Sequence, residues 1–108
     1  MKFYRGTPPG TVVVVKDDRE QYLNPQNRLR NHSPDGFAWG YGGSGPSQLA
    51  LAILVDVIGK EAATTHPAYY QDFKFDVIAG LPREGFILTA AEIDASLAKL
   101  RARRKPVE

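Results

Sequence analysis

Three groups of residues have types and spacing that could support chemistry: a glycine loop, a run with histidine, serine and aspartate, and a basic end. Gly40, Gly42 and Gly45 fit the pattern G-x-G-x-x-G directly before an apolar segment. In dinucleotide-binding folds this pattern holds a pyrophosphate at a helix N-terminus. Here no parallel strand with a closing acidic residue follows, and Gly45 leads into Pro-Ser-Gln instead of the Lys-Ser/Thr of a P-loop. We therefore expect no nucleotide cofactor, and no cofactor of any other kind.

Two interpretations of the glycine loop, residues 40–45, stay open. Glycines supply positive φ for a sharp turn, here with aromatic neighbours packed over their faces, and we favour this structural role. Alternatively, N–H groups of the loop and of the helix start could hold a phosphate or a partner's carboxylate. If the protein binds a partner or ligand through this motif, the expected contact residues are Trp39, Tyr41, Gly42, Gly43 and Ser44.

The run His32, Ser33 and Asp35 contains the residue types of a catalytic triad. Neighbours in one turn cannot easily form the required line from nucleophile through base to orienting group. Turn chemistry explains the aspartate, and capping explains the serine. We expect no catalytic residue and thus a protein that is not an enzyme.

Metal sites are also not expected. His32 and His66 are too few, and they lack acidic residues at a suitable spacing. The chain has no cysteine, which excludes thiolate zinc sites, disulfides and cysteine nucleophiles.

The basic end carries much of the formal net charge of +2. Its candidate nucleic-acid contacts are Arg101, Arg103, Arg104 and Lys105, because each phosphate contact by Lys or Arg adds salt-dependent affinity. No sequence-reading motif accompanies them. Cations at a helix C-terminus also complement the helix dipole, so we favour a solvated helix end and keep nucleic-acid binding as an alternative.

The first part of the chain predicts β-strands. Residues 2–5 and 11–16 are β-rich and are separated by a Gly/Pro turn, which indicates an antiparallel pair. Four consecutive valines at 12–15 indicate a strand that is central in its sheet or covered on both faces. We expect further strands at residues 20–23 and 37–39.

The second part predicts three helices. Residues 46–58 are apolar around most of the circumference, so this should be the central core helix. A second helix should start at Pro67 and end by Gly80, with Phe75 on the face opposite its apolar stripe. After a short strand at 86–88, Thr89 and Glu92 have capping-box spacing for a third helix. We therefore predict an α+β fold, in which a small antiparallel sheet of three to four strands packs against three helices.

At 108 residues the chain fits one domain. We place this domain at residues 1–100 and a basic tail at 101–108. No secretory signal and no apolar run of about 20 residues are visible, so we expect neither membrane insertion nor export. A cytoplasmic location is consistent with the lack of cysteine.

The central run HSPDGFAWGYGGSGPSQLALAIL, the later YYQDFKFDVIAGLP and the ending FILTAAEI resemble an uncharacterised family, domain-of-unknown-function family 6166. The resemblance covers residues 3–97 and implies membership without an activity. Members occur in bacteria and on phages and plasmids, which implies an accessory or anti-defence role. We expect a non-enzymatic domain that acts by contact with an unidentified protein partner. Nucleic-acid binding by the basic end and anion or nucleotide binding by the glycine loop are the alternatives.

Overall fold

The computed structural model describes residues 1–65 and 69–103. Its elements, in chain order, are β1 (Lys2–Thr7), β2 (Thr11–Lys16), β3 (Arg19–Tyr22), α1 (Ser44–Ile58), α2 (Lys60–Thr65), α3 (Tyr69–Asp76), the short 3₁₀ helix η1 (Ile78–Gly80), β4 (Phe86–Thr89) and α4 (Ala90–Arg103). Strands gather at the start and helices follow, with one late strand. The predicted α+β class is confirmed.

The four strands form one antiparallel sheet in the order β3-β2-β1-β4. β2 is an internal strand, as its run of valines predicts. In the register, Tyr4 lies opposite Val14 on one side and Leu88 on the other. Directly paired residues share a face, and the Tyr4 hydroxyl donates to Asp56 of α1, so this is the face that packs on the helices.

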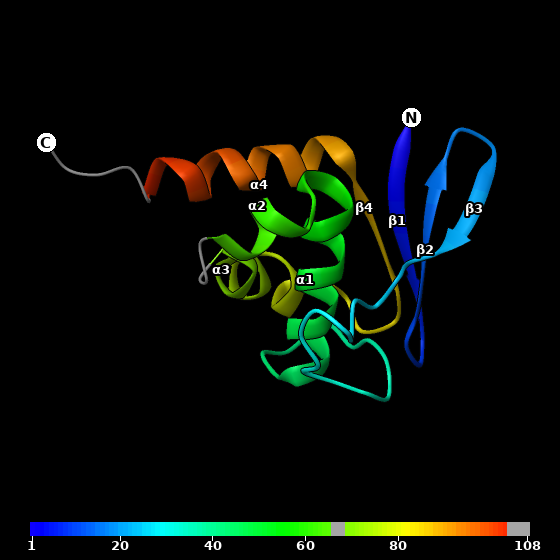
Figure 1. Cartoon of the computed structure of the whole chain (residues 1–108). Coiled ribbons are helices and arrows are strands. Elements are labelled where there is room, and N and C mark those ends of the chain that lie inside the picture. Colours follow the sequence, from blue (N-terminus) through cyan, green and yellow to red (C-terminus); the bar gives the residue numbers. More distant parts are fainter. Residues whose placement is uncertain (66–68, 104–108) are drawn as a thin grey trace, which may run out of the picture.

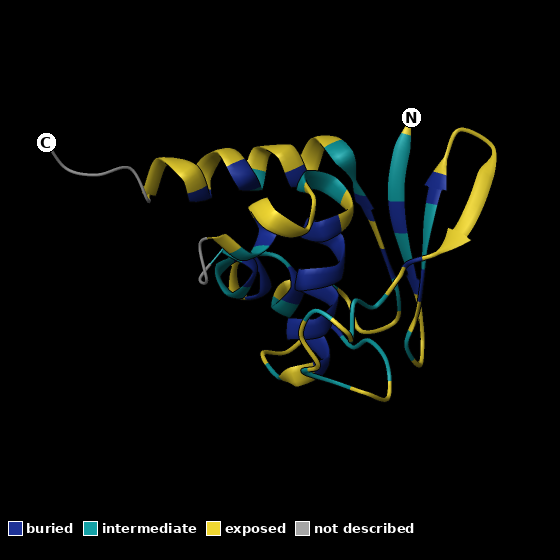
Figure 2. Ribbon diagram, in the orientation of Figure 1, coloured by how far each residue is buried: buried dark blue, intermediate teal, exposed yellow. Residues whose placement is uncertain are grey.

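The molecule has two layers, with all the helices on one face of the sheet (Figure 1). α1 stands in the middle, and every residue from 45 to 55 is buried, as Figure 2 shows. An almost wholly apolar helix is stable in water only when neighbours cover it on all sides. The prediction of a central core helix is therefore confirmed.

α4 begins with the predicted capping box. The Glu92 carboxylate accepts from the backbone N–H of Thr89 at 3.1 Å, and the Glu92 N–H donates to the Thr89 hydroxyl at 3.1 Å. These reciprocal bonds satisfy N–H groups that the helix leaves without partners. Ile93, Leu97 and Leu100 lie on one face and are all buried, as their spacing predicts.

Several boundaries differ from the prediction. Residues 37–39 form no strand; instead, the N–H of Gly40 donates to Ile78 and the Trp39 indole to the carbonyl of Pro82. One backbone bond and one side-chain bond thus hold this segment in place of a strand ladder. α1 starts at Ser44, two residues earlier than predicted, and the third strand starts and ends one residue earlier, at Arg19–Tyr22.

The helices after α1 also depart from the prediction. α2 is an additional short helix that starts immediately after Gly59, whose φ of +88° ends α1. The predicted start of the next helix, Pro67, lies outside the described residues. The described part of this helix, α3, ends at Asp76, and the 3₁₀ helix η1 follows from Ile78. The described residues therefore form four α-helices, not three.

A long loop, residues 23–43, joins the sheet to α1 and is held from inside by Gln48. The buried side chain of Gln48 donates from Nε2 to the carbonyls of Pro25 and Arg30, and its Oε1 accepts from the N–H groups of His32 and Ser33. One amide thus uses two donors and two acceptors. These four hydrogen bonds fix the path of the loop over α1.

Candidate binding surface at the glycine loop

The glycine loop consists of the last four residues of the long loop and the first two residues of α1. Gly40 has φ +85°, a conformation that favours glycine. Its N–H donates to Ile78 at 3.0 Å, and its carbonyl accepts from Arg83 Nε at 3.4 Å. Gly40 is therefore the position at which the chain turns sharply, as the structural interpretation of the loop predicts.

The other glycines differ in their roles. A Cβ built on Gly45 would lie 2.6 Å from the Cβ of Ala38, so Gly45 permits a close approach inside the core. A Cβ on Gly43 would meet the ring of Tyr41 at 2.5 Å, and one on Gly42 would meet the ring of Phe75 at 3.1 Å. These last two glycines lie under aromatic rings at the surface, and Gly42 is exposed.

Trp39 belongs to the core, although the sequence places it among the contact residues. It is 5% exposed. Its indole N–H donates to the carbonyl of Pro82 at 2.9 Å, and its ring meets that of Phe86 edge-on at 5.0 Å. A buried indole usually satisfies its N–H in this way. Trp39 thus anchors the glycine loop to the core.

Two aromatic rings beside the loop are open to solvent. Tyr41 is 46% exposed and Phe75, from α3, is 63% exposed. The guanidinium of Arg83 lies 5.8 Å from the Tyr41 ring centre, and Lys74 Nζ lies 4.1 Å from the centre of Phe75. Each ring is therefore within cation–π distance of a basic residue. We call Tyr41, Gly42, Gly43, Phe75 and Arg83 the loop surface.

The N-terminus of α1 adjoins the loop surface. Gly43 is the N-cap residue, no side chain caps the helix, and its first turn has no acidic residue. Ser44 is exposed at this end, whereas Gly45 is buried. The residues before the loop form no strand, so the strand–loop–helix context of a dinucleotide site is not present.

The histidine, serine and aspartate of the long loop do not come together as a triad. His32 Nε2 lies 3.1 Å from the Tyr70 hydroxyl, and the backbone N–H groups of His32 and Ser33 are held by Gln48. Burial, and then the positive charges of Lys74 and Arg30, lower the pKa of His32. No general base is aligned with the serine here.

The basic end is partly described. Arg101 and Arg103 continue α4 beyond the expected domain boundary at residue 100, and both are exposed. Arg103 pairs with Asp76 of α3, so part of its charge is compensated. Arg104 and Lys105 lie outside the described residues.

Comparison with known protein families identifies the family of the chain. The model of the family of unknown function DUF6166 matches residues 4–99. The chain belongs to DUF6166. No curated protein and no solved structure matches it. The family match includes the sheet except the first two residues of β1, the glycine loop, and α4 up to Lys99.

Two further properties concern the described part of this DUF6166 chain. Within residues 1–65 and 69–103, no helix is long and apolar enough to cross a membrane. The same residues contain no group of three or more His, Cys, Asp or Glu side chains arranged to hold a metal ion.

The DUF6166 sheet has a second surface that the sequence did not reveal. Residues adjacent to Tyr4 in β1 point away from the helices, because side chains alternate along a strand. With their partners in the register they form the outer sheet face, whose apolar members are Phe3, Val13, Val15, Tyr22 and Ile87. Val15 is buried, whereas Tyr22 and Ile87 are exposed, and none of the five belongs to the core cluster around α1. The strand sequences predict that side chains alternate between the two faces of the sheet. Only the register shows which residues of the different strands share the outer face.

Proposed function

We propose that this DUF6166 chain is a non-enzymatic binding domain that contacts a partner protein through the loop surface. The observation that supports this proposal is the pair of exposed rings, Phe75 beside Gly42 and Tyr41 beside Gly43. A phenylalanine that is mostly exposed on a helix loses the stabilisation of apolar burial. Binding of a partner would recover it.

The composition of the loop surface suits a contact site. Tyr and Arg are enriched among the residues that dominate binding energy at protein interfaces, and Arg83 lies over Tyr41. A hollow of about 200 Å³ lies beside them, lined by Pro9, Ala38, Trp39, Tyr41 and Arg83. It offers a partner side chain a place next to the tyrosine ring.

The backbone beneath the rings is constrained. Gly40 is bonded to η1 and Gly45 is packed against Ala38, so both ends of the loop are fixed. A surface that is already ordered loses less conformational entropy on binding. Gly42 is exposed between these ends, and its lack of a side chain lets a partner approach the backbone.

We place this contact function in an accessory factor of bacterial or mobile-element origin, with an anti-defence-like role as one form of it. This part of the proposal rests on the resemblance of the central sequence motif to the family. The partner and the process would follow from the experiment below.

Affinity capture from the native host tests the loop surface. The variant Tyr41→Ala/Phe75→Ala should lose partners that the unchanged protein retains, because both rings would leave the interface. The matched control is Tyr22→Ala/Ile87→Ala, which removes the two most exposed apolar side chains of the outer sheet face. If the loop variant captures all partners and the control variant loses them, the partner binds the outer sheet face and not the loop surface.

Two other measurements separate the alternatives. Salt-sensitive retention on a nucleic-acid column would support binding by the basic end. A thermal shift with nucleotide that Ser44→Ala reduces would support a ligand at the glycine loop. Partner capture that depends on Tyr41 and Phe75, without either effect, supports protein contact.

A further inference from the structure

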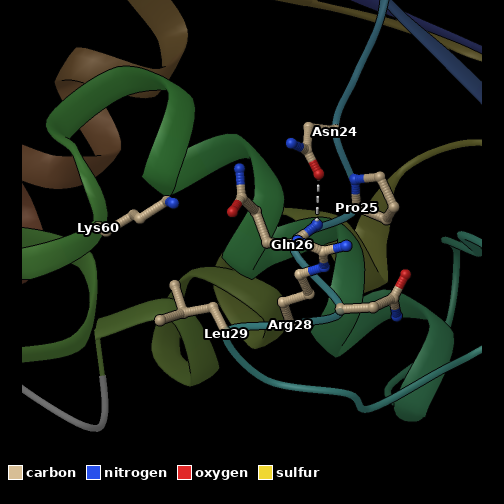
Figure 3. A pocket seen from close by; sticks show the side chains of 7 residues that line it. Asn24, Pro25, Gln26, Arg28, Leu29 and Lys60 are labelled. Atoms are coloured by element: carbon tan, nitrogen blue, oxygen red, sulfur yellow. Dashed lines mark hydrogen bonds between the residues drawn. The ribbon is translucent and has the colours of Figure 1, made fainter.

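A pocket of about 490 Å³ opens between the first part of the long loop and the start of α2. It is distant in sequence from the loop surface and forms no part of it. Figure 3 shows the side chains that line it: Asn24, Pro25, Gln26, Asn27, Arg28, Leu29 and Lys60. The volume lies within the usual range for small-molecule sites.

The charged and polar groups of this pocket share one character. Arg28 and Lys60 carry positive charge, and Asn24, Gln26 and Asn27 carry amides. None of the residues that line the pocket is acidic. Asn27 Nδ2 donates to Asn31 and to the carbonyl of Ser33. The two cations and the side-chain amides of Asn24 and Gln26 match the oxygen atoms of an anion.

The two cations have no carboxylate partner within the part of the chain that the structure describes. The ion pairs found there involve the N-terminus, Lys2, Arg5 and Arg103. Arg28 and Lys60 come from segments separated by a helix, yet they line the same pocket. An anion in this pocket would be attracted by both positive charges, with no lining carboxylate to oppose it.

The loop wall of the pocket is held in place. Gln48 donates to the carbonyls of Pro25 and Arg30, which lie on either side of lining residues 26–29 in the chain. Within the loop, Gln26 has φ +61° and its carbonyl accepts from the N–H groups of Leu29 and Arg30, at 3.0 and 3.1 Å. Asn24 Oδ1 accepts from the N–H of Gln26 at 2.9 Å, the bond drawn in Figure 3.

This internal bonding means that a ligand does not have to order the loop. Binding to a wall that already has its shape costs less conformational entropy. The loop is therefore held in one conformation by its own hydrogen bonds and by those of Gln48.

We propose that this pocket binds a small phosphate-bearing molecule, with Arg28 and Lys60 on its phosphate oxygens. Arg28 supplies a planar donor pair and Lys60 a compact ammonium. The amides of Asn24 and Gln26 donate to the remaining oxygens or to the group that carries the phosphate. The volume leaves space for an organic group beside the phosphate.

Backbone-amide NMR at constant ionic strength tests the proposal, with inorganic phosphate and glycerol 3-phosphate as probes. Millimolar additions should shift the backbone-amide signals of Asn24, residues 26–29 and Lys60 to saturation. Arg28→Gln and Lys60→Gln should each weaken binding about fivefold or more, since each removes a charge-assisted contact. Arg19→Gln, which removes an exposed arginine from β3, should leave the affinity unchanged.

Comparison of the probes identifies the source of the phosphate. Tighter binding of the ester indicates that the organic group is also held, and equal binding indicates a site for the phosphate group alone. The proposal is overturned if neither probe gives saturating shifts in these residues, or if both pocket variants bind as the unchanged protein does. Either result leaves the loop-surface proposal untouched.

Discussion

The backbone N–H of His32 donates to Oε1 of Gln48 at 2.7 Å, which ties the long loop to the buried centre of α1. The same side chain holds Ser33, Pro25 and Arg30. A polar residue is thus stable in the buried part of α1 because all its hydrogen-bonding capacity is used. Both proposed sites depend on this loop, the pocket directly and the loop surface through the path of the chain.

Gln48→Met should lower the free energy of unfolding by at least about 2 kcal/mol. Methionine keeps much of the volume but leaves buried N–H and carbonyl groups without partners, and each such group is costly. Urea unfolding measures the loss. Gln21→Met, on the exposed strand β3, is the control and should change stability by less than about 0.5 kcal/mol. Equal stability of the two variants would contradict the role of Gln48.

Leu54→Ala should cost about 2 to 5 kcal/mol, because the side chain is fully buried and its removal leaves a cavity. Urea unfolding should show the loss with an unchanged m-value. Ile87→Ala is the comparison: this residue is exposed on the outer sheet face, so its loss should be below about 1 kcal/mol. A loss below about 1 kcal/mol for Leu54→Ala would refute the central position of α1.

The glycines should divide by position. Gly45→Ala places a Cβ against Ala38 in the core, and Gly40→Ala puts a side chain at positive φ beside the carbonyl of Leu81. Each should cost about 1 to 3 kcal/mol. Gly42→Ala meets only the edge of the exposed Phe75 ring at 3.1 Å, and should cost less than about 1 kcal/mol. Melting temperatures of the three variants decide this; a reversed order would contradict the assignment.

Alkaline pH should weaken the fold through Tyr4. Burial, and then the hydrogen bond and charge of Asp56, raise the pKa of Tyr4 far above its usual value. An unfolded tyrosine loses its proton near pH 10, whereas the native one keeps it. The native state then binds more protons, so stability is full below about pH 10 and falls above it, by up to about 1.4 kcal/mol per pH unit.

Urea unfolding of Tyr4→Phe between about pH 8 and about pH 11 is the control for this effect. The variant should be less stable at the lower pH, because Asp56 loses a donor. Its stability should decline less steeply than that of the unchanged protein as the pH rises. Parallel curves would show that Tyr4 does not cause the decline.

The fold was predictable where local signals agree with packing. The valine run indicated an internal strand, the apolar segment indicated α1, and Thr89 with Glu92 indicated the start of α4. The missed features depend on distant contacts. α2 has only a short polar sequence, which carries no strong helix signal. Residues 37–39 have the composition of a strand, but Trp39 bonds to Pro82 and the following residue, Gly40, bonds to Ile78.

The candidate sites show the same division. The glycine pattern drew attention to Tyr41, and its exposure agrees with a contact role. Phe75 was visible only as a residue on the wrong face of its helix, because nothing local showed that its ring covers Gly42. The pocket needs Lys60 beside residues 24–29, a pairing that no spacing rule predicts.

Truncation after Leu100 should leave the domain folded. Leu100 is fully buried, whereas Arg101 and Arg103 are exposed. The truncation removes the ion pair between Arg103 and Asp76, whose side chains are 56% and 37% exposed. Such surface pairs contribute at most about 1 kcal/mol. Leu100→Ala in the full chain should cost more, about 2 to 5 kcal/mol.

Thermal unfolding of the two proteins shows where the stably folded domain ends. A second measurement tests whether the basic end binds nucleic acid. If that end binds nucleic acid, the folded, truncated protein should lose its retention on a nucleic-acid column and the salt dependence with it, since both arise from phosphate contacts. Leu100→Ala, which keeps every arginine, should retain binding at temperatures where it is folded. A folded truncated protein that is still fully retained would remove Arg101, Arg103, Arg104 and Lys105 as the contact residues.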